Sequence, residues 1–226
     1  MKSNYRIANM EVYKYVLRPI DSNMYVMIKN KSALIIDPHI NFDVDFLLQE
    51  KDVRYIWMIL THEHFDHISG VNHFKENWTC TVICGQHAKE AVSKPEKNLS
   101  AYFRAMYMNK EQEIINQADA IFEENYSCEA DIGFERVYDF KWEDVSVHLV
   151  ETPGHSKGSI CVIIDQDYVF TGDTLVDGNK IITRLPGGSK RDYQLITRPF
   201  LEKLSPETII YPGHGRENNI SAFEIA

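Results

Sequence analysis

The stretch His62-Glu63-His64-Phe65-Asp66-His67 places four metal-ligand side chains within six positions. It follows Arg54-Tyr55-Ile56-Trp57-Met58-Ile59-Leu60, an apolar run rich in β-branched and aromatic residues, which predicts a buried strand. The first two histidines are two residues apart and can point the same way from an extended segment, and the aspartate and third histidine then turn toward a neighbouring point. This arrangement favours two adjacent metal ions over one. The alternative is a polar turn that happens to be rich in histidine.

Three later strand-like segments also end in a turn that carries one histidine or one aspartate. These turns are Thr152-Pro153-Gly154-His155-Ser156, Thr171-Gly172-Asp173-Thr174 and Tyr211-Pro212-Gly213-His214-Gly215. Each turn alone is weak evidence for a metal ligand. Because the strands of one sheet end at a common edge, all these turns together predict that their side chains converge there.

The ordered set of these ligand types resembles that of the metallo-β-lactamase-fold hydrolases, and within them most closely the glyoxalase II (hydroxyacylglutathione hydrolase) type. The set is His62, His64, Asp66, His67, His155, Asp173 and His214. The resemblance extends to Ala33-Leu34-Ile35-Ile36-Asp37-Pro38 and covers nearly the whole chain. It implies an α/β fold, a four-layer αββα sandwich with the metals at one sheet edge.

The resemblance also implies how the ligands divide. One ion would be held by His62, His64 and His155, the other by Asp66, His67 and His214, and Asp173 would bridge both. Imidazole and carboxylate ligands suit zinc, with iron and manganese as alternatives, so two Zn²⁺ ions per chain are expected. Asp66 and Asp173 are the expected catalytic residues. Asp37 is expected to orient a ligand imidazole through its second N–H, and the alternative is that it only starts the turn before Pro38.

The function implied is a dinuclear metal-dependent hydrolase that uses a metal-bridging hydroxide on a small ester or thioester, since zinc lowers the pKa of bound water to about 7. Alternatives within the superfamily are a lactonase, a phosphodiesterase or a mono-iron enzyme similar to the persulfide dioxygenases. A non-catalytic metal-binding module is the alternative from another class. In the loop 178–191, Ile182 stands where such relatives usually have Arg and Arg184 where Asp is usual, which argues against a glutathione substrate. We expect Arg184 to bind an anionic group of the substrate through its bidentate guanidinium, and the alternative is a solvated basic loop.

Composition sets the remaining expectations. A chain of 226 residues with 44% hydrophobic residues predicts one domain, residues 1–226. The net charge of −9 argues against nucleic acid as the partner and leaves a small molecule. No segment approaches membrane-spanning length and no apolar leader is apparent, so a cytoplasmic enzyme with no membrane partner is expected.

The pattern of apolar residues predicts two mixed sheets with helices outside. Residues 95–127 interrupt it with helical spacing, which predicts two inserted helices. They form a lid or a homodimer surface beside the metal edge, or only pack against the sandwich without contact to the substrate. Among the histidines outside the ligand set, His39 is the one placed near the cleft, although a surface loop position is preferred for it. The expected strands lie near 12–17, 24–29, 33–37, 54–60, 79–84, 134–140, 145–150, 159–164, 167–171 and 208–211, and the expected helices near 42–50, 67–76, 86–92 and 192–203.

Overall fold

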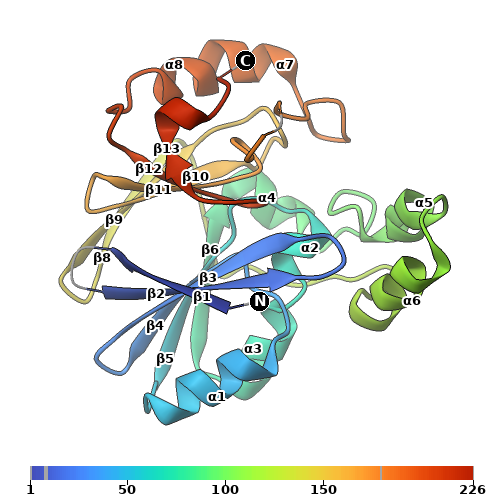
Figure 1. The fold of residues 1–226 in the computed structure, drawn as a ribbon, viewed down its shortest axis with the longest axis horizontal. Helices are drawn as coiled ribbons and strands as arrows, with labels where there is room; N and C mark the ends of the chain where they lie inside the picture. Colours follow the sequence, from blue (N-terminus) through green and yellow to red (C-terminus); the bar gives the residue numbers. More distant parts are fainter. Residues whose placement is uncertain (1, 8–9, 179, 226) are drawn as a thin grey trace.

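Two mixed β-sheets face one another, and helices cover the outer face of each (Figure 1). The computed structural model describes residues 2–7, 10–178 and 180–225. Helices α1 and α3 lie against the first sheet and helices α7 and α8 against the second. The prediction of a four-layer αββα sandwich is therefore confirmed.

The first sheet is built from consecutive strands in the order β1-β2-β3-β4-β5-β6-β7. The first four strands pair antiparallel, whereas β4 to β7 pair parallel. The parallel part requires helices as connections, because parallel strands cannot be joined by a tight turn. The strands are β1 Lys2–Ile7, β2 Met10–Leu17, β3 Ser22–Lys29, β4 Ser32–Ile36, β5 Tyr55–Ile59, β6 Cys80–Gly85 and β7 Ile132–Phe134.

The second sheet has the order β13-β12-β11-β10-β9-β8. Its pairs are antiparallel except for β11 and β12, which run parallel. The strands are β8 Val137–Trp142, β9 Val145–Glu151, β10 Ile160–Ile164, β11 Tyr168–Gly172, β12 Ile209–Pro212 and β13 Asn218–Asn219.

The helices are short and most of them connect strands. They are α1 Phe42–Glu50, α2 Phe65–Ile68, α3 Val71–Asn77, α4 Gln86–Ala91, α5 Phe103–Tyr107, α6 Gln112–Ile121, α7 Lys190–Asp192 and α8 Arg198–Leu201, with 3-10 turns at Ser100–Tyr102 and Ile220–Ala222 and a π-helical turn at Tyr193–Thr197. Helices α5 and α6 stand beside the sandwich rather than on a sheet face (Figure 1).

Strand β4 shows how the sequence produces two buried faces. All five of its residues are buried, and successive side chains alternate between faces. Leu34 and Ile36 pack between the two sheets, whereas Ala33 and Ile35 pack under helices α1 and α3. A strand covered on both faces needs a continuous apolar run, and residues 33–36 supply it.

The turns that carry the predicted ligands leave the sandwich at one edge. Strands β4 and β5 run parallel, so residue 37 and the turn after residue 60 lie side by side. In the second sheet β11 and β12 run parallel, and β9 shares their direction because β10 is antiparallel to both β9 and β11. The carboxyl ends of these five strands therefore meet, and Asn23 N donates to Gly213 O at 2.7 Å to tie the two sheets together there.

Three predicted elements differ in extent from those observed. The helix expected over 67–76 is divided into α2 and α3 at Ser69-Gly70, where the chain passes so close to His39 that a Cβ on Gly70 would lie 2.6 Å from the His39 carbonyl carbon. The strand expected over 134–140 is two strands in different sheets, separated by a turn in which Arg136 has φ 63°. The helix expected over 192–203 starts at Lys190, ends at Leu201 and contains a π-helical turn. Strands β1 and β13 were not predicted.

The insertion over 95–127 contains the expected helices, α5 and α6. Its buried side chains form an apolar cluster with Leu17 and Phe65, the latter inside the histidine-rich turn. The insertion is therefore packed against the segment that carries the ligands.

Candidate metal centre

The turn after β5 holds its side chains in place through the backbone. Phe65 N donates to Asn98 O at 2.9 Å, which fixes the turn to the insertion, and α2 begins at Phe65. Ser22 Oγ donates to Asp66 O at 3.1 Å. The four predicted ligands of this turn are all buried, with exposures between 0% and 6%. Such burial is unusual for polar side chains and points to partners inside the molecule.

One group of potential ligands consists of His62, His64 and His155. Their ligand atoms lie within 4.8 Å of one another. The Nε2 atom of His155 is 2.9 Å from Nδ1 of His64. This is the first of the two clusters that the sequence predicted.

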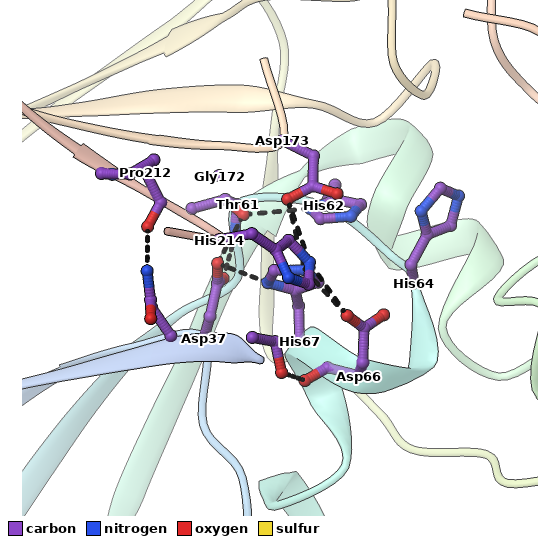
Figure 2. Close-up of polar contacts among 12 residues, drawn as sticks. Asp37, Thr61, His62, His64, Asp66, His67, Gly172, Asp173, Pro212 and His214 are labelled. Carbon is purple, nitrogen blue, oxygen red and sulfur yellow. Dashed lines mark hydrogen bonds and ion pairs between the residues drawn. The ribbon is translucent and has the colours of Figure 1, made fainter. Parts of the chain in front are cut away.

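A second group consists of Asp66, His67 and His214, whose ligand atoms also lie within 4.8 Å of one another (Figure 2). The Nε2 atoms of the two histidines are 3.3 Å apart. Asp66 Oδ2 is 3.2 Å from Nε2 of His67 and 3.3 Å from Nε2 of His214. Asp37, His62 and His67 make a third such combination, so His67 belongs to two overlapping sets.

Asp173 lies between the two groups. Its Oδ1 is 3.5 Å from Nε2 of both His67 and His214, and its Oδ2 is 3.5 Å from Nε2 of His155. Figure 2 shows this carboxylate descending from the second sheet toward the imidazoles. Gly213 is required beside it, because a Cβ there would lie 2.4 Å from Asp173 Oδ1.

Several buried polar atoms of this centre have no hydrogen-bond partner. Nε2 of His62, Nε2 of His64 and Oδ1 of Asp173 are each shielded from solvent without one. A buried polar atom without a partner costs about 1–3 kcal/mol. A cation coordinated by imidazole nitrogens and carboxylate oxygens would remove that cost, so the residues present fit a metal ion.

In four of the ligand imidazoles the Nδ1 atom lies within hydrogen-bond distance of an oxygen atom of the protein. His67 Nδ1 is 3.0 Å from Asp37 Oδ2, and His62 Nδ1 is 3.1 Å from Thr61 Oγ1. Nδ1 of His155 and Nδ1 of His214 lie 2.9 Å and 3.2 Å from the carbonyl oxygens of residues 182 and 20. These contacts set the ring orientation and leave the Nε2 atoms facing the centre.

Asp37 has further contacts. It is 2% exposed and accepts hydrogen bonds from Thr61 N and Thr61 Oγ1, both at 2.7 Å. Its φ of 54° is a conformation that aspartate tolerates better than most residues. Asp37 thus joins the end of β4 to the start of the histidine-rich turn and to one imidazole of the second group.

Burial and charge act differently on the two groups. Burial lowers the pKa of His62 and His155, and lowers that of His64 to about 3, so all three are neutral at pH 7. For His67, the carboxylates of Asp66, Asp173 and Asp37 outweigh burial and hold the pKa well above its usual value. A neutral imidazole is ready to bind a metal, whereas a protonated one must release its proton first.

A cavity of about 570 Å³ opens over the centre. His64, Asp66, His155, Asp173 and His214 form one end of it. Its volume is in the range of small-molecule sites. Arg184 is exposed and is not among the residues that line this cavity, so its expected contact with the substrate stays a prediction.

Two features of the centre were missed or misplaced by sequence reasoning. Glu63, between two ligand histidines, is 4% exposed and accepts a hydrogen bond from Ser156 Oγ at 2.7 Å, so it connects the His62 turn to the His155 turn. The preferred surface position for His39 was wrong, because this side chain is 1% exposed. Burial lowers the pKa of His39 to about 4.

Fold and ligand arrangement together define the class, and comparison with known proteins agrees. Residues 17–214 match the metallo-β-lactamase superfamily, so the chain belongs to this superfamily. Membership explains why the ligands sit on strand ends of both sheets.

The individual relatives differ from this chain at most sequence positions. The chain is 31% identical over 215 residues to a probable metallo-hydrolase of Methanocaldococcus jannaschii, covering 91% of this chain and 93% of the relative. It is 28% identical over 204 residues to the probable metallo-hydrolase YqgX of Bacillus subtilis, covering 89% of each. A hydroxyacylglutathione hydrolase of Pelagibacter ubique is 25% identical over 217 residues, with coverage of 93% and 74%. At the level of the class, the prediction of a metal-dependent hydrolase is confirmed.

Solved structures show the same fold. The B3 metallo-β-lactamase BLEG-1 superimposes with a TM-score of 0.73 at 23% identity, covering 92% of this chain and 94% of that one. TTHA1623, solved in a di-iron-bound form, gives a TM-score of 0.68 at 22% identity, with coverage of 92% and 95%. Among the described residues, none of the helices has the length and apolar character needed to cross a bilayer.

Proposed function

We propose that this protein hydrolyses a small ester or thioester, in the manner of glyoxalase II, with two metal ions per chain. The observation that carries the proposal is the position of Asp173, whose two carboxylate oxygens face nitrogens of different ligand groups at 3.5 Å. A carboxylate placed between two clusters favours a dinuclear centre over a single ion. The similarity to a hydroxyacylglutathione hydrolase supports the thioester class.

When bound, a pair of zinc, iron or manganese ions supplies Lewis acidity and lowers the pKa of water enough for attack at neutral pH. His62, His64 and His155 would hold one ion, and Asp66, His67 and His214 the other. Both groups contact the cavity, so an acyl carbon can approach them from that side.

The chain's own residues contribute orientation and exclusion of water. Asp37 and the carbonyl oxygens of residues 20 and 182 fix the imidazole rings, so little reorganisation is needed during the reaction. Phe65 and Leu99 border the ligands in the cavity and shield them from bulk solvent. A drier site strengthens each electrostatic interaction within it.

The test combines metal analysis with turnover. Protein purified with zinc, iron or manganese supplied should contain close to two ions per chain, and it should hydrolyse simple thioesters or esters faster than lactones or phosphodiesters. Rapid-mixing turnover should show no burst and no trapped acyl-enzyme, as expected if water rather than a side chain attacks. A single iron with the Asp66, His67 and His214 group empty, or preferential cleavage of phosphodiesters, would reject the proposal.

A further inference from the structure

The walls of the cavity over the metal centre are mainly apolar. Beyond the ligands, most of the side chains that line it are apolar: Ile20, Phe65, Leu99, Met106, Val176, Ile182 and Leu185. They come from separate parts of the chain, including the β2–β3 turn, the insertion and the loop after β11. An apolar lining favours the part of a ligand that water solvates poorly.

The charged residues of the wall are already paired. Among the described lining residues, Asp21 and Lys180 are the charged side chains outside the ligand set. Asp21 Oδ1 is 2.8 Å from Arg18 Nη1, and Lys180 Nζ is 2.8 Å from Glu224 Oε1. The Lys180 side chain is part of the lining but is 70% exposed, so it is largely solvated. Outside the ligand set, the described lining residues therefore offer no buried positive charge to an anionic tail.

The insertion contributes to the wall from a fixed position. Phe103 and Tyr107 of α5 are buried with Phe65 in one apolar cluster, which anchors the helix beside the ligand turn. Met106, on the same helix, lines the cavity and is 42% exposed. Its flexible thioether chain can adapt to ligands of different shape.

We propose that this cavity binds an unbranched, uncharged alkyl chain, so that the substrate is a fatty acyl ester or thioester whose acyl chain lies against Met106. The proposal rests on the proposed hydrolase function for the orientation of the ester. It also favours an alkyl tail over the anionic tail expected from the sequence, because Arg184 is exposed and is not among the residues that line the cavity.

Binding of product-like acids tests the wall without requiring turnover. Isothermal titration of the zinc-supplied protein with butyrate, hexanoate and octanoate should show affinity rising by up to about fourfold per methylene, the value for full burial of one CH₂. Octanedioate has the length of octanoate but ends in a second carboxylate. It should bind at least about tenfold more weakly than octanoate, because the apolar wall would have to desolvate that charge.

A matched pair of substitutions locates the effect. Met106→Gln should flatten the chain-length dependence and weaken octanoate severalfold, while butyrate binding stays unchanged. Met108→Gln is the control, since Met108 lies next to the same helix, is 69% exposed and is not part of the cavity lining. It should leave the chain-length dependence intact.

The outcomes separate the two proposals. Equal affinity for all three acids, tighter binding of octanedioate, or equal effects of the two methionine substitutions would overturn the alkyl-chain assignment. If affinity rises with chain length but neither fatty acyl esters nor thioesters are cleaved, the assignment of the wall stands and the proposed hydrolysis fails. If esters are cleaved without regard to chain length, hydrolysis stands and the wall assignment fails.

Discussion

Asp37→Asn separates the two ligand groups experimentally. Asparagine has nearly the shape of aspartate and tolerates the φ of 54° at this position, so the backbone is expected to keep its course. The variant loses the negative charge and one of two acceptor oxygens. Thr61 N, at 2.7 Å from Oδ1, can keep its acceptor, while the new amide then faces Nδ1 of His67 at 3.0 Å.

The expected cost follows from these contacts. One charge-assisted hydrogen bond to an imidazole is lost, which corresponds to about 1.5–3 kcal/mol. Removing the partner of a metal-ligating imidazole typically lowers metal affinity by about 10–100-fold. The loss should fall on the Asp66, His67 and His214 group. The His62, His64 and His155 group should weaken less, because Asp37 reaches it only indirectly, through Thr61 Oγ1, which lies 3.1 Å from His62 Nδ1.

Zinc titration against a competing chelator measures both affinities in one experiment. Asp52→Asn is a matched control, since Asp52 has φ 51° and pairs with Lys31 at 2.6 Å on the surface. The control should leave both zinc affinities unchanged. Equal weakening of both groups by Asp37→Asn, or no change in either, would refute the reasoning.

Three further predictions concern other buried groups. Asp173→Ala should reduce zinc occupancy of both groups and abolish hydrolysis, because its carboxylate faces both; metal analysis that shows loss from one group only would contradict its bridging position. His39→Gln should make the protein less sensitive to acid. Burial holds the pKa of His39 at about 4 in the folded protein, against 6.5 in the unfolded chain, so this histidine does not affect stability above pH 6.5 but lowers it by about 2 kcal/mol by pH 5. The variant lacks the imidazole and should keep that part of its stability at pH 5. Urea unfolding with chelator present at pH 7.5 and pH 5 measures this, and equal losses in both proteins would reject it. Glu63→Ala should remove the carboxylate acceptor of Ser156 Oγ and leave it only Ser159 Oγ, 3.0 Å away, at a cost of about 0.5–1.5 kcal/mol. It should also weaken zinc binding at the His155 group, whereas Glu63→Gln should restore most of both; identical behaviour of the two variants in zinc titration would argue against the hydrogen bond as the cause.

The sequence was sufficient to predict the convergence of the ligands. Strand patterns placed each ligand turn at a carboxyl end, and the geometry of sheets then brings those ends together. What the pattern could not provide was the partner of each side chain. His39 looked like a loop residue because it follows the turn-forming pair Asp37-Pro38, yet Gly70 and the β2 backbone enclose it in the fold.

The same limit explains why the contact of Glu63 and the direction of the Arg184 side chain could not be predicted from the sequence. Glu63 alternates away from the two ligand histidines, and only the structure shows that Ser156 lies on that side. Arg184 is in the loop that follows Asp173, but the direction of a loop side chain depends on local dihedral angles that composition does not determine. The division of 134–140 into two sheets depended on a single left-handed residue, Arg136, which carries no strong sequence signal.

The attachment of His214 to the first sheet has a thermodynamic consequence. Its backbone forms an isolated bridge with Ser22, so this ligand comes from the second sheet but is positioned by the first. Neither ligand group can be assembled from one sheet alone. In each group one histidine, His155 or His214, follows a strand of the second sheet, and the other two ligands follow strand β5 of the first sheet. In the proposed dinuclear centre, metal binding would therefore be coupled to the association of the two sheets, and each bound ion would stabilise that association by RT ln(1 + [metal]/Kd). Free zinc at about a hundred times Kd would add about 2.7 kcal/mol per site, so the availability of metal sets how readily the two sheets separate.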